Sequence, residues 1–168
     1  MNTAEPRPAV ERVKPPDGPF RLINPVMRWV LSTPRRAGRV GDQLLLLHLT
    51  GRKSGRVLDI PVGYRPAEDG RLLVMTNSLW RVNLRGTDDL DVTLRGVRMP
   101  AHAELVEDPE LVATAYQRLI NQVGHAKAGR RLGIRINVDR APTHAELAEA
   151  AGREGLSVIY LAPTPSPS

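Results

Sequence analysis

Apolar residues near the start of the chain recur at intervals of three and four positions, and arginines lie between and after them. The residues with this spacing are Phe20, Ile23, Met27, Val30 and Leu31. The spacing predicts an amphipathic helix over residues 20–31, which ends before Pro34. We expect this helix to cover the core. A membrane-surface helix is the alternative, because Trp29 stands beside the arginines.

Denser apolar runs and period-two alternation predict strands from residue 43 onward. The densest run covers residues 44–47 and Leu49 and is closed by Gly51, as expected for a strand buried on both faces. Asp69-Gly70 and Arg95-Gly96-Val97 are hairpin turn signals. The predicted strands are residues 43–50, 57–64, 71–77, 90–94, 99–106 and 156–161.

Two further helices are predicted before the last strand. Pro109 opens a helix that runs to about residue 123, and acidic residues precede it at its N-terminus. Thr143 and Glu146 form a capping-box signature for a helix over residues 143–152. A helix, a run of antiparallel strands, two helices and one returning strand predict an α+β fold, a small antiparallel barrel with flanking helices.

The chain has 168 residues, a length typical of one domain. Both ends are rich in proline, which predicts a disordered arm over residues 1–19 and a disordered tail over residues 164–168. One folded domain is therefore expected over residues 20–163.

The composition excludes several kinds of chemistry. The sequence contains no cysteine, which removes disulfides, thiolate nucleophiles, iron–sulfur clusters and zinc sites that need sulfur. No apolar run approaches the roughly 18 to 20 residues that span a bilayer, and the polar start does not resemble a secretory signal. We expect a cytoplasmic protein, with attachment to the inner face of the membrane as the alternative.

Positive charge is concentrated in the first third of the chain. Residues 1–65 carry 12 Lys and Arg against 5 acidic residues, whereas the remaining residues carry 12 against 13. Most of these cations are arginine, whose planar guanidinium binds phosphate and carboxylate groups through paired hydrogen bonds. An anionic partner is one explanation, and an arginine-rich composition is the other.

The most specific motif lies between the first two predicted strands, at residues 50–56, with the sequence Thr-Gly-Arg-Lys-Ser-Gly-Arg. Two glycines permit a tight backbone path with exposed N–H groups, and three cations and two hydroxyls accompany them. The segment predicts an anion-binding loop, and a solvated hairpin tip is the alternative. It is not a Walker loop, since the spacing and the following helix are absent.

Further motifs follow the loop in a fixed order. They are Pro61, Tyr64, Thr76-Asn77-Ser78, Trp80, Asn83-Leu84 and a Val-x-Leu-x-Gly strand over residues 92–96. In this order the chain resembles the deazaflavin-dependent nitroreductase family, over about residues 24–119 and again at 158–163. The resemblance implies a split β-barrel of the flavin-binding type and coenzyme F420 as cofactor. FMN or no cofactor are the alternatives.

The resemblance also implies roles for individual residues. Those implied to hold the coenzyme's phosphate and polyglutamate end are Thr50, Arg52, Lys53, Ser54, Gly55 and Arg56. Those implied to line the deazaflavin ring or close the site are Thr76, Asn77, Ser78, Trp80 and Asn83. Ser78 and Tyr64 are candidate catalytic hydroxyls, because hydride transfer to an acceptor creates negative charge on oxygen that a hydroxyl stabilises. For Tyr64, packing in the core is the alternative.

Other polar residues point to structural roles. His48 lies within an apolar strand, which favours a hydrogen-bonded core histidine over a metal ligand. Asp88, Asp89 and Asp91 lack the spacing of a calcium loop and predict a solvated turn. We therefore predict no metal site. Few aromatic residues are available for base stacking, so nucleic-acid binding is not expected.

Two functions follow from these observations. The first is an F420-dependent oxidoreductase that transfers hydride to a small-molecule acceptor of the quinone, enone or nitro class. The second is a non-catalytic split-barrel protein that binds a lipid, a fatty acid or another anionic apolar ligand. Two features favour the second function. Leu58 stands where related proteins usually have an arginine, and a single residue, Leu79, separates Ser78 from Trp80. Homodimerisation and peripheral membrane contact are further expectations.

Overall fold

The computed structural model describes residues 5–13 and 19–165. They form two compact units, each assembled from separate stretches of the chain. The first contains residues 5–13, 76–78 and 106–158, and the second contains residues 19–75, 79–105 and 159–165. The sequence predicts one domain over residues 20–163. Of the predicted disordered ends, residues 1–4, 14–18 and 166–168 lie outside the described residues.

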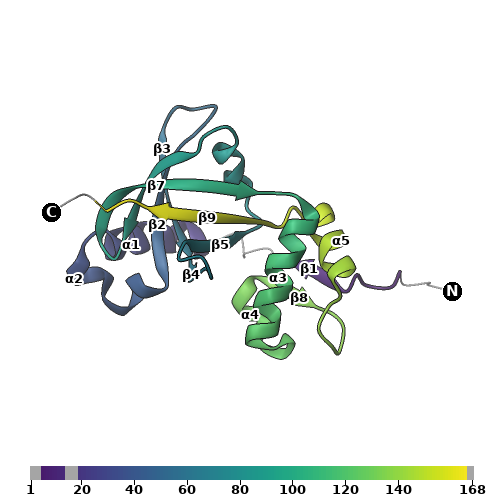
Figure 1. The fold of residues 1–168 in the computed structure, drawn as a ribbon. Coiled ribbons are helices and arrows are strands. Elements are labelled where there is room, and N and C mark those ends of the chain that lie inside the picture. The colour runs from purple at the N-terminus through teal and green to yellow at the C-terminus, as the bar shows by residue number, and fades with distance from the viewer. Residues whose placement is uncertain (1–4, 14–18, 166–168) are drawn as a thin grey trace. The chain divides into compact units, whose positions relative to one another are not determined.

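A seven-stranded sheet with the order β3-β2-β6-β7-β9-β5-β4 organises the second unit (Figure 1). The ladders β2–β3, β2–β6, β6–β7 and β4–β5 are antiparallel. The strands are Leu44–Thr50 (β2), Val57–Gly63 (β3), Arg65–Pro66 (β4), Leu72–Thr76 (β5), Asp89–Leu94 (β6), Val97–Val106 (β7) and Ser157–Pro163 (β9). Each strand predicted from the apolar pattern is confirmed, with ends that differ by at most about two residues, the usual uncertainty of strand ends.

The two edges of this sheet belong to one stretch of chain. β3 and β4 lie at opposite edges of the sheet, yet only Tyr64 separates them in sequence. β3 pairs with β2, and β4 pairs with β5. A sheet whose edges are joined in this way must curl, which confirms the α+β split β-barrel. Pro61 fits because β3 is an edge strand, where a missing N–H donor is tolerated.

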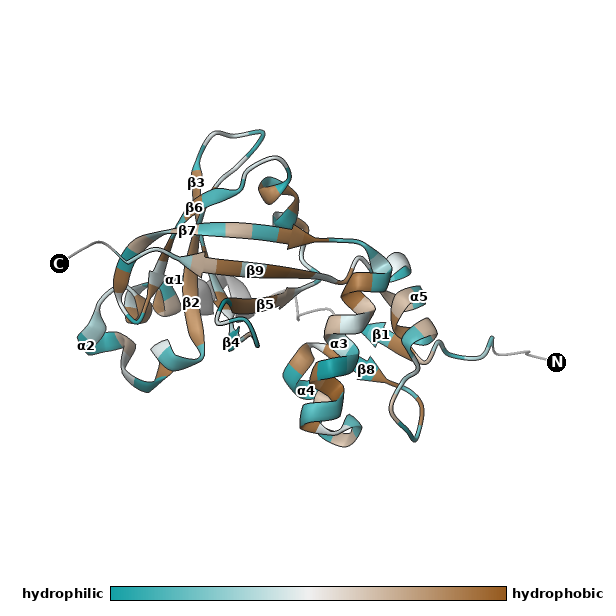
Figure 2. Ribbon diagram, viewed as in Figure 1, coloured by the Kyte–Doolittle hydropathy of each residue, from teal (hydrophilic) through white to brown (hydrophobic). Residues whose placement is uncertain are grey.

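The core of the second unit lies inside the curled sheet. Leu45, Leu47 and Leu49 project into it from β2 and are buried. Figure 2 shows that β2 and β9 are hydrophobic along most of their length, whereas β7 alternates. On β7 the buried residues are Ala101 and Ala103, because alternate side chains of a strand face opposite sides.

Short helices flank the sheet. They are Pro19–Leu31 (α1), Pro34–Ala37 (α2), and the 3-10 helices Gly38–Asp42 (η1) and Leu79–Leu84 (η2). α1 confirms the predicted helix, although the side chains of Phe20 and Ile23 lie outside the described part of the chain. Within residues 5–13 and 19–165, every helix is too short or too polar to cross a bilayer.

The first unit consists of three helices and a two-stranded antiparallel sheet. Its elements are Val10–Arg12 (β1), Pro109–Val123 (α3), His125–Leu132 (α4), Ile134–Ile136 (β8) and His144–Glu154 (α5). α3 begins at the predicted residue, and the Asp108 carboxylate accepts hydrogen bonds from the first turn. The predicted capping box of α5 is also confirmed, with Thr143 and Glu146 bonded in both directions.

Two parts of the first unit differ from the sequence prediction. Residues 1–19 are predicted to have no structure, but Val10–Arg12 forms β1 and pairs with β8, with Val10 opposite Ile136. No element is predicted for residues 124–137, which form α4 and β8. β1 and β8 were missed because a three-residue strand has almost no local signal and each is defined by a partner more than a hundred residues away.

Candidate functional site

The loop between β2 and β3 is held in shape by its own hydrogen bonds. The N–H of Gly51 donates to the Arg56 carbonyl (2.8 Å), and the N–H of Gly55 donates to the Gly51 carbonyl (2.9 Å). The N–H of Arg56 donates to Ser54 Oγ (3.2 Å). A side chain at Gly51 would place its Cβ 2.7 Å from that Oγ, so Ser54 would have to move and give up its bond to the Arg56 N–H. The loop is therefore a fixed structure.

These bonds correct one part of the sequence prediction. The glycines were expected to leave backbone N–H groups exposed for an anion, but those of Gly51, Gly55 and Arg56 are already bonded within the loop. The N–H of Arg52 is also engaged, by Asn83 Oδ1 at 3.0 Å. These four N–H groups are thus not free for an anion, and the side-chain cations are the main attraction for one at this loop.

Asn83 connects the loop to η2. Its Oδ1 accepts the Arg52 N–H, and its Nδ2 donates to the Trp80 carbonyl at 2.9 Å. Arg52 adds a second link, from Nη1 to the Val82 carbonyl at 3.3 Å. The sequence predicts both Arg52 and Asn83 as site residues, and the structure brings them together. Both the oxygen and the nitrogen of the Asn83 amide are hydrogen-bonded to protein atoms, so this side chain positions the loop.

A cavity of about 680 Å³ lies between the loop and η2. The residues that line it are Gly51, Arg52, Lys53, Ser54, Val82, Asn83 and Arg85. Sequence reasoning missed Val82 and Arg85, whose only signal is their position beside Asn83. The cavity has the size of a small-molecule site.

Two cations of this loop, Lys53 and Arg56, have no carboxylate partner, unlike several arginines elsewhere in the described residues. Lys53 and Arg56 are exposed, and no carboxylate in the described part of the chain pairs with either of them. By contrast, Arg71 binds Asp69 and Glu104 at 2.7 Å each. Unpaired cations on a fixed loop, beside a cavity, are suited to an anionic ligand.

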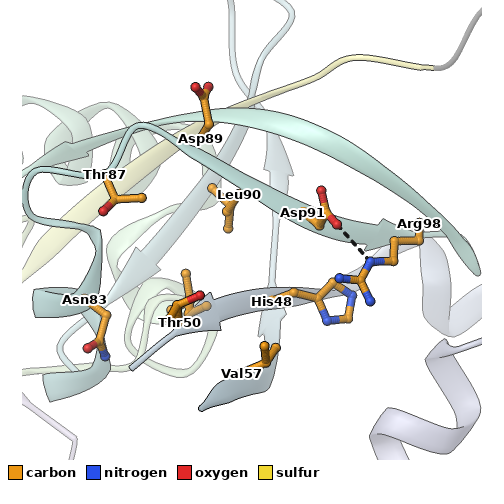
Figure 3. Close-up of a pocket in the computed structure, with 10 residues that line it drawn as sticks. His48, Thr50, Val57, Asn83, Thr87, Asp89, Leu90, Asp91 and Arg98 are labelled. Carbon is orange, nitrogen blue, oxygen red and sulfur yellow. Dashed lines mark hydrogen bonds and ion pairs between the residues drawn. The ribbon is translucent and has the colours of Figure 1, made fainter. Parts of the chain in front are cut away.

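A smaller cavity of about 220 Å³ shares Asn83 with the first and has a different character (Figure 3). Its wall includes Thr50, Asp89 and Asp91, and Asp91 pairs with Arg98 at 3.0 Å, as the dashed line in Figure 3 shows. Carboxylates in this wall disfavour an anion. An anionic group is therefore expected in the larger cavity.

His48 also lines the smaller cavity, and its ring is fully engaged. Nδ1 lies 2.7 Å from Asp59 Oδ1, and Nε2 lies 2.7 Å from Thr93 Oγ1. These three residues stand on β3, β2 and β6, so the ring connects three adjacent strands. This confirms the prediction of a hydrogen-bonded core histidine.

Tyr64 has a structural role. Its side chain is 9% exposed, and its hydroxyl donates to the Gly41 carbonyl at 2.8 Å. The predicted catalytic role for this hydroxyl is therefore not retained, since the donor proton is committed to the backbone and the ring packs in the core.

The segment Thr76-Asn77-Ser78 begins at the last residue of β5 and is grouped with the first unit, whereas the cationic loop belongs to the second. Thr76 is buried, and its Oγ1 accepts the N–H of Ser78 at 3.0 Å. Asn77 and Ser78 are half-buried. Trp80 packs against the barrel core. The predicted contact of these residues with a coenzyme ring stays a prediction.

The fold and this loop define a split β-barrel protein with a cationic loop beside a ligand-sized cavity. The sequence profile of one family, described as F420H2-dependent quinone reductase, matches residues 30–141. This is more than half of the chain, and the chain belongs to that family. The match confirms the resemblance found from the motifs, and it assigns the chain to the F420-dependent reductases, with F420 as coenzyme.

Comparison with curated proteins gives no match. Several solved structures are similar, and three of them illustrate the range. One, described as a domain-swapped dimer, is 15% identical with a TM-score of 0.44, and the alignment covers 86% of this chain and 100% of that chain. A protein of unknown function from Agrobacterium tumefaciens is 18% identical with a TM-score of 0.43, covering 93% of this chain and 57% of that one. An F420 reductase is 15% identical with a TM-score of 0.37, covering 82% and 93%.

Proposed function

We propose that this protein transfers hydride from reduced F420 to a quinone-like acceptor and holds the anionic end of the coenzyme at the loop over residues 50–56. The family match supports the reaction class. The observation that carries the site is the pair of exposed, unpaired cations Lys53 and Arg56 on a loop fixed by its own hydrogen bonds.

The residues present fit the phosphate and carboxylates of such a coenzyme. Arg52, Lys53 and Arg56 stand within five consecutive positions, and the cavity beside them has no acidic residue in its lining. A carboxylate or phosphate placed there exchanges water for charged hydrogen bonds. Because the loop is already ordered, little conformational entropy is lost when the ligand binds.

In this proposal, some residues bind the coenzyme and others hold the loop in place. Bound F420, when reduced, supplies the hydride. Lys53 and Arg56 attract and hold its anionic end, while Asn83 and Ser54 keep the loop backbone in place.

The loop is tested by Lys53→Ala combined with Arg56→Ala. We expect F420 affinity, measured by fluorescence titration, to fall by about tenfold or more for each cation, because hydrogen bonds between charged groups contribute about 1.5–3 kcal/mol. The melting temperature should be unchanged, since both side chains are exposed and unpaired.

The matched control is Lys127→Ala combined with Arg130→Ala, which removes two exposed cations from α4. It changes net charge equally and should leave F420 affinity unaltered. Equal losses in the two double variants would assign the effect to net charge and contradict the proposed loop site.

The acceptor is tested by anaerobic oxidation of reduced F420, followed by absorbance. A naphthoquinone, a cyclic enone and a nitroarene are compared at equal concentration, and the naphthoquinone should react fastest. A faster enone or nitroarene would contradict the quinone assignment. Tight F420 binding without turnover on any acceptor would favour the non-catalytic binding protein.

A further inference from the structure

Helix α1 presents apolar side chains on more than one side. Leu31 is 1% exposed, and Met27 and Val30 are half-buried, so this side of the helix meets the rest of the second unit. Val26 and Trp29, one helical turn apart, are 59% and 61% exposed. A helix that only covers a core needs a single apolar face. The second apolar side therefore has no packing role among the described residues.

Four exposed arginines lie on α1 and on the two elements that follow it. Arg28 stands on α1, Arg35 and Arg36 on α2 and Arg39 on η1, and all four are exposed. No Asp or Glu occurs from residue 18 to residue 41. Among the described residues none of these four arginines pairs with a carboxylate. The positive charge of the surface is therefore not neutralised.

The elements that carry these side chains are in contact with one another. α1 contacts α2, and α2 contacts η1, which carries the exposed Val40 (Figure 1). Arg36 lies over the Trp29 ring, 4.5 Å from its centroid, and its Nε donates to the Trp29 carbonyl at 2.9 Å. We call this surface the basic helical patch. Its members are Val26, Arg28, Trp29, Arg35, Arg36, Arg39 and Val40.

We propose that the basic helical patch docks on the surface of an anionic phospholipid bilayer. Tryptophan beside arginine suits the headgroup region, where the ring enters the apolar boundary and the guanidinium stays with phosphate. A second copy of the chain is a poor occupant, because a twofold contact would bring arginines against arginines. The proposal does not depend on the coenzyme or on the acceptor.

The first test is co-sedimentation of the full chain with vesicles. Vesicles of equimolar phosphatidylcholine and phosphatidylglycerol should bind the protein, and vesicles of phosphatidylcholine alone should not. Binding should weaken as salt is raised, because salt screens the attraction between exposed charges. Equal binding to both vesicles, binding that is insensitive to salt, or no binding to either would overturn the proposal.

The second test locates the surface. Arg28→Gln combined with Arg39→Gln should weaken binding about 25-fold, since each basic residue near an anionic surface contributes about fivefold. The control, Lys127→Gln combined with Arg130→Gln, removes the same charge from α4 and should retain binding. Both are compared after circular dichroism has shown that they are folded. Equal losses in both variants would show general charge attraction and overturn the patch.

A third measurement follows Trp29 directly. Its emission should shift to shorter wavelength when anionic vesicles are added, and the shift should be absent in Trp29→Phe, which retains Trp80. Sedimentation velocity of the free protein completes the set. A dimer that Trp29→Ala dissolves would assign the surface to self-association and overturn the bilayer proposal. Reduction of a soluble naphthoquinone should be the same in Arg28→Gln/Arg39→Gln and unmodified protein, which separates this test from that of the reductase.

Discussion

At the scale of single residues, polar groups of the second unit differ in whether their hydrogen bonds are used within the fold. His48 and Asn83 each bond protein atoms on both sides, and the Tyr64 hydroxyl is held by a carbonyl. Such groups stabilise the fold and are poorly placed to bind a ligand. Lys53 and Arg56 have no carboxylate partner in the described residues, so their charges are available to bind a ligand.

Leu58 offers a test of the loop at this scale. A Cβ on Gly51 would lie 3.9 Å from Leu58 Cδ1, so position 58 lies against the start of the loop. We expect Leu58→Arg to tighten F420 binding by about tenfold, because it adds one cation to those already present. Fluorescence titration measures the change.

Val57 provides the matched control for that substitution. It is the neighbour of Leu58 on β3, is also exposed and lines the smaller cavity, which has acidic residues in its wall. Val57→Arg should leave F420 affinity unchanged, since successive side chains of a strand face opposite sides. If Val57→Arg tightened binding as much as Leu58→Arg, the coenzyme would not be recognised at the loop.

At the scale of elements, turns and caps determine how strands and helices meet. The turn between β6 and β7 uses Arg95 and Gly96, both with positive φ, at 50° and 81°. A Cβ on Gly96 would lie 2.1 Å from the carbonyl carbon of Thr33 and from the nitrogen of Pro34. This turn therefore packs tightly against the chain between α1 and α2, and only glycine fits.

Gly96→Ala should consequently destabilise the protein by several kcal/mol, about 3 or more, because the clash involves backbone atoms that cannot move aside. Gly86→Ala is the matched control. Gly86 has a φ of 76°, but nothing lies within 4 Å of its added Cβ. It should cost only about 1 kcal/mol, the usual penalty of the left-handed region. Urea unfolding measures both, and similar losses would contradict the packing explanation.

The Glu146 carboxyl, in the capping box of α5, is expected to titrate at unusually low pH. Two hydrogen bonds from Arg140, at 2.7 and 2.9 Å, and one from the Thr143 N–H, at 2.8 Å, lower the pKa of Glu146 to about 2 from 4.5. Because the folded-state pKa is the lower one, this stabilisation is present above about pH 4.5 and is lost as the pH falls toward 2. NMR of the side-chain carboxyl should show the low pKa.

Arg140→Gln tests the cause of that shift. The substitution removes the two hydrogen bonds from the Arg140 guanidinium but leaves the bond from the Thr143 N–H to Glu146. The pKa of Glu146 should then rise toward its ordinary value. A value that stays near 2 in this variant would show that Arg140 is not the main cause.

At the scale of the whole molecule, each unit is assembled from distant parts of the sequence. The first unit joins residues 5–13 to residues 106–158, and β1 pairs with β8 across that interval. The second unit places β3 and β4, which only Tyr64 separates in the sequence, at opposite edges of its sheet. Removing residues 1–13 would therefore take away a structural strand as well as a polar terminus.

Much of the fold was determined by the sequence itself. The strand of leucines at β2, the helices α1, α3 and α5, the capping box and the hairpin turns all follow from local periodicity, caps and turn chemistry. The motif order was also sufficient to indicate the family that the profile match shows. These features can be predicted because each depends on residues within a few positions of one another.

Only the tertiary structure decided the remaining features. It joined Arg52 to Asn83, which are 31 positions apart, and showed that the N–H groups of Gly51, Gly55 and Arg56 are already bonded within the loop. It placed the Tyr64 hydroxyl on Gly41, 23 positions away, and formed β1 from a segment with no strand signal. Each of these depends on which distant atoms meet, and a hydrogen-bond donor in the sequence does not specify its acceptor until the chain has folded.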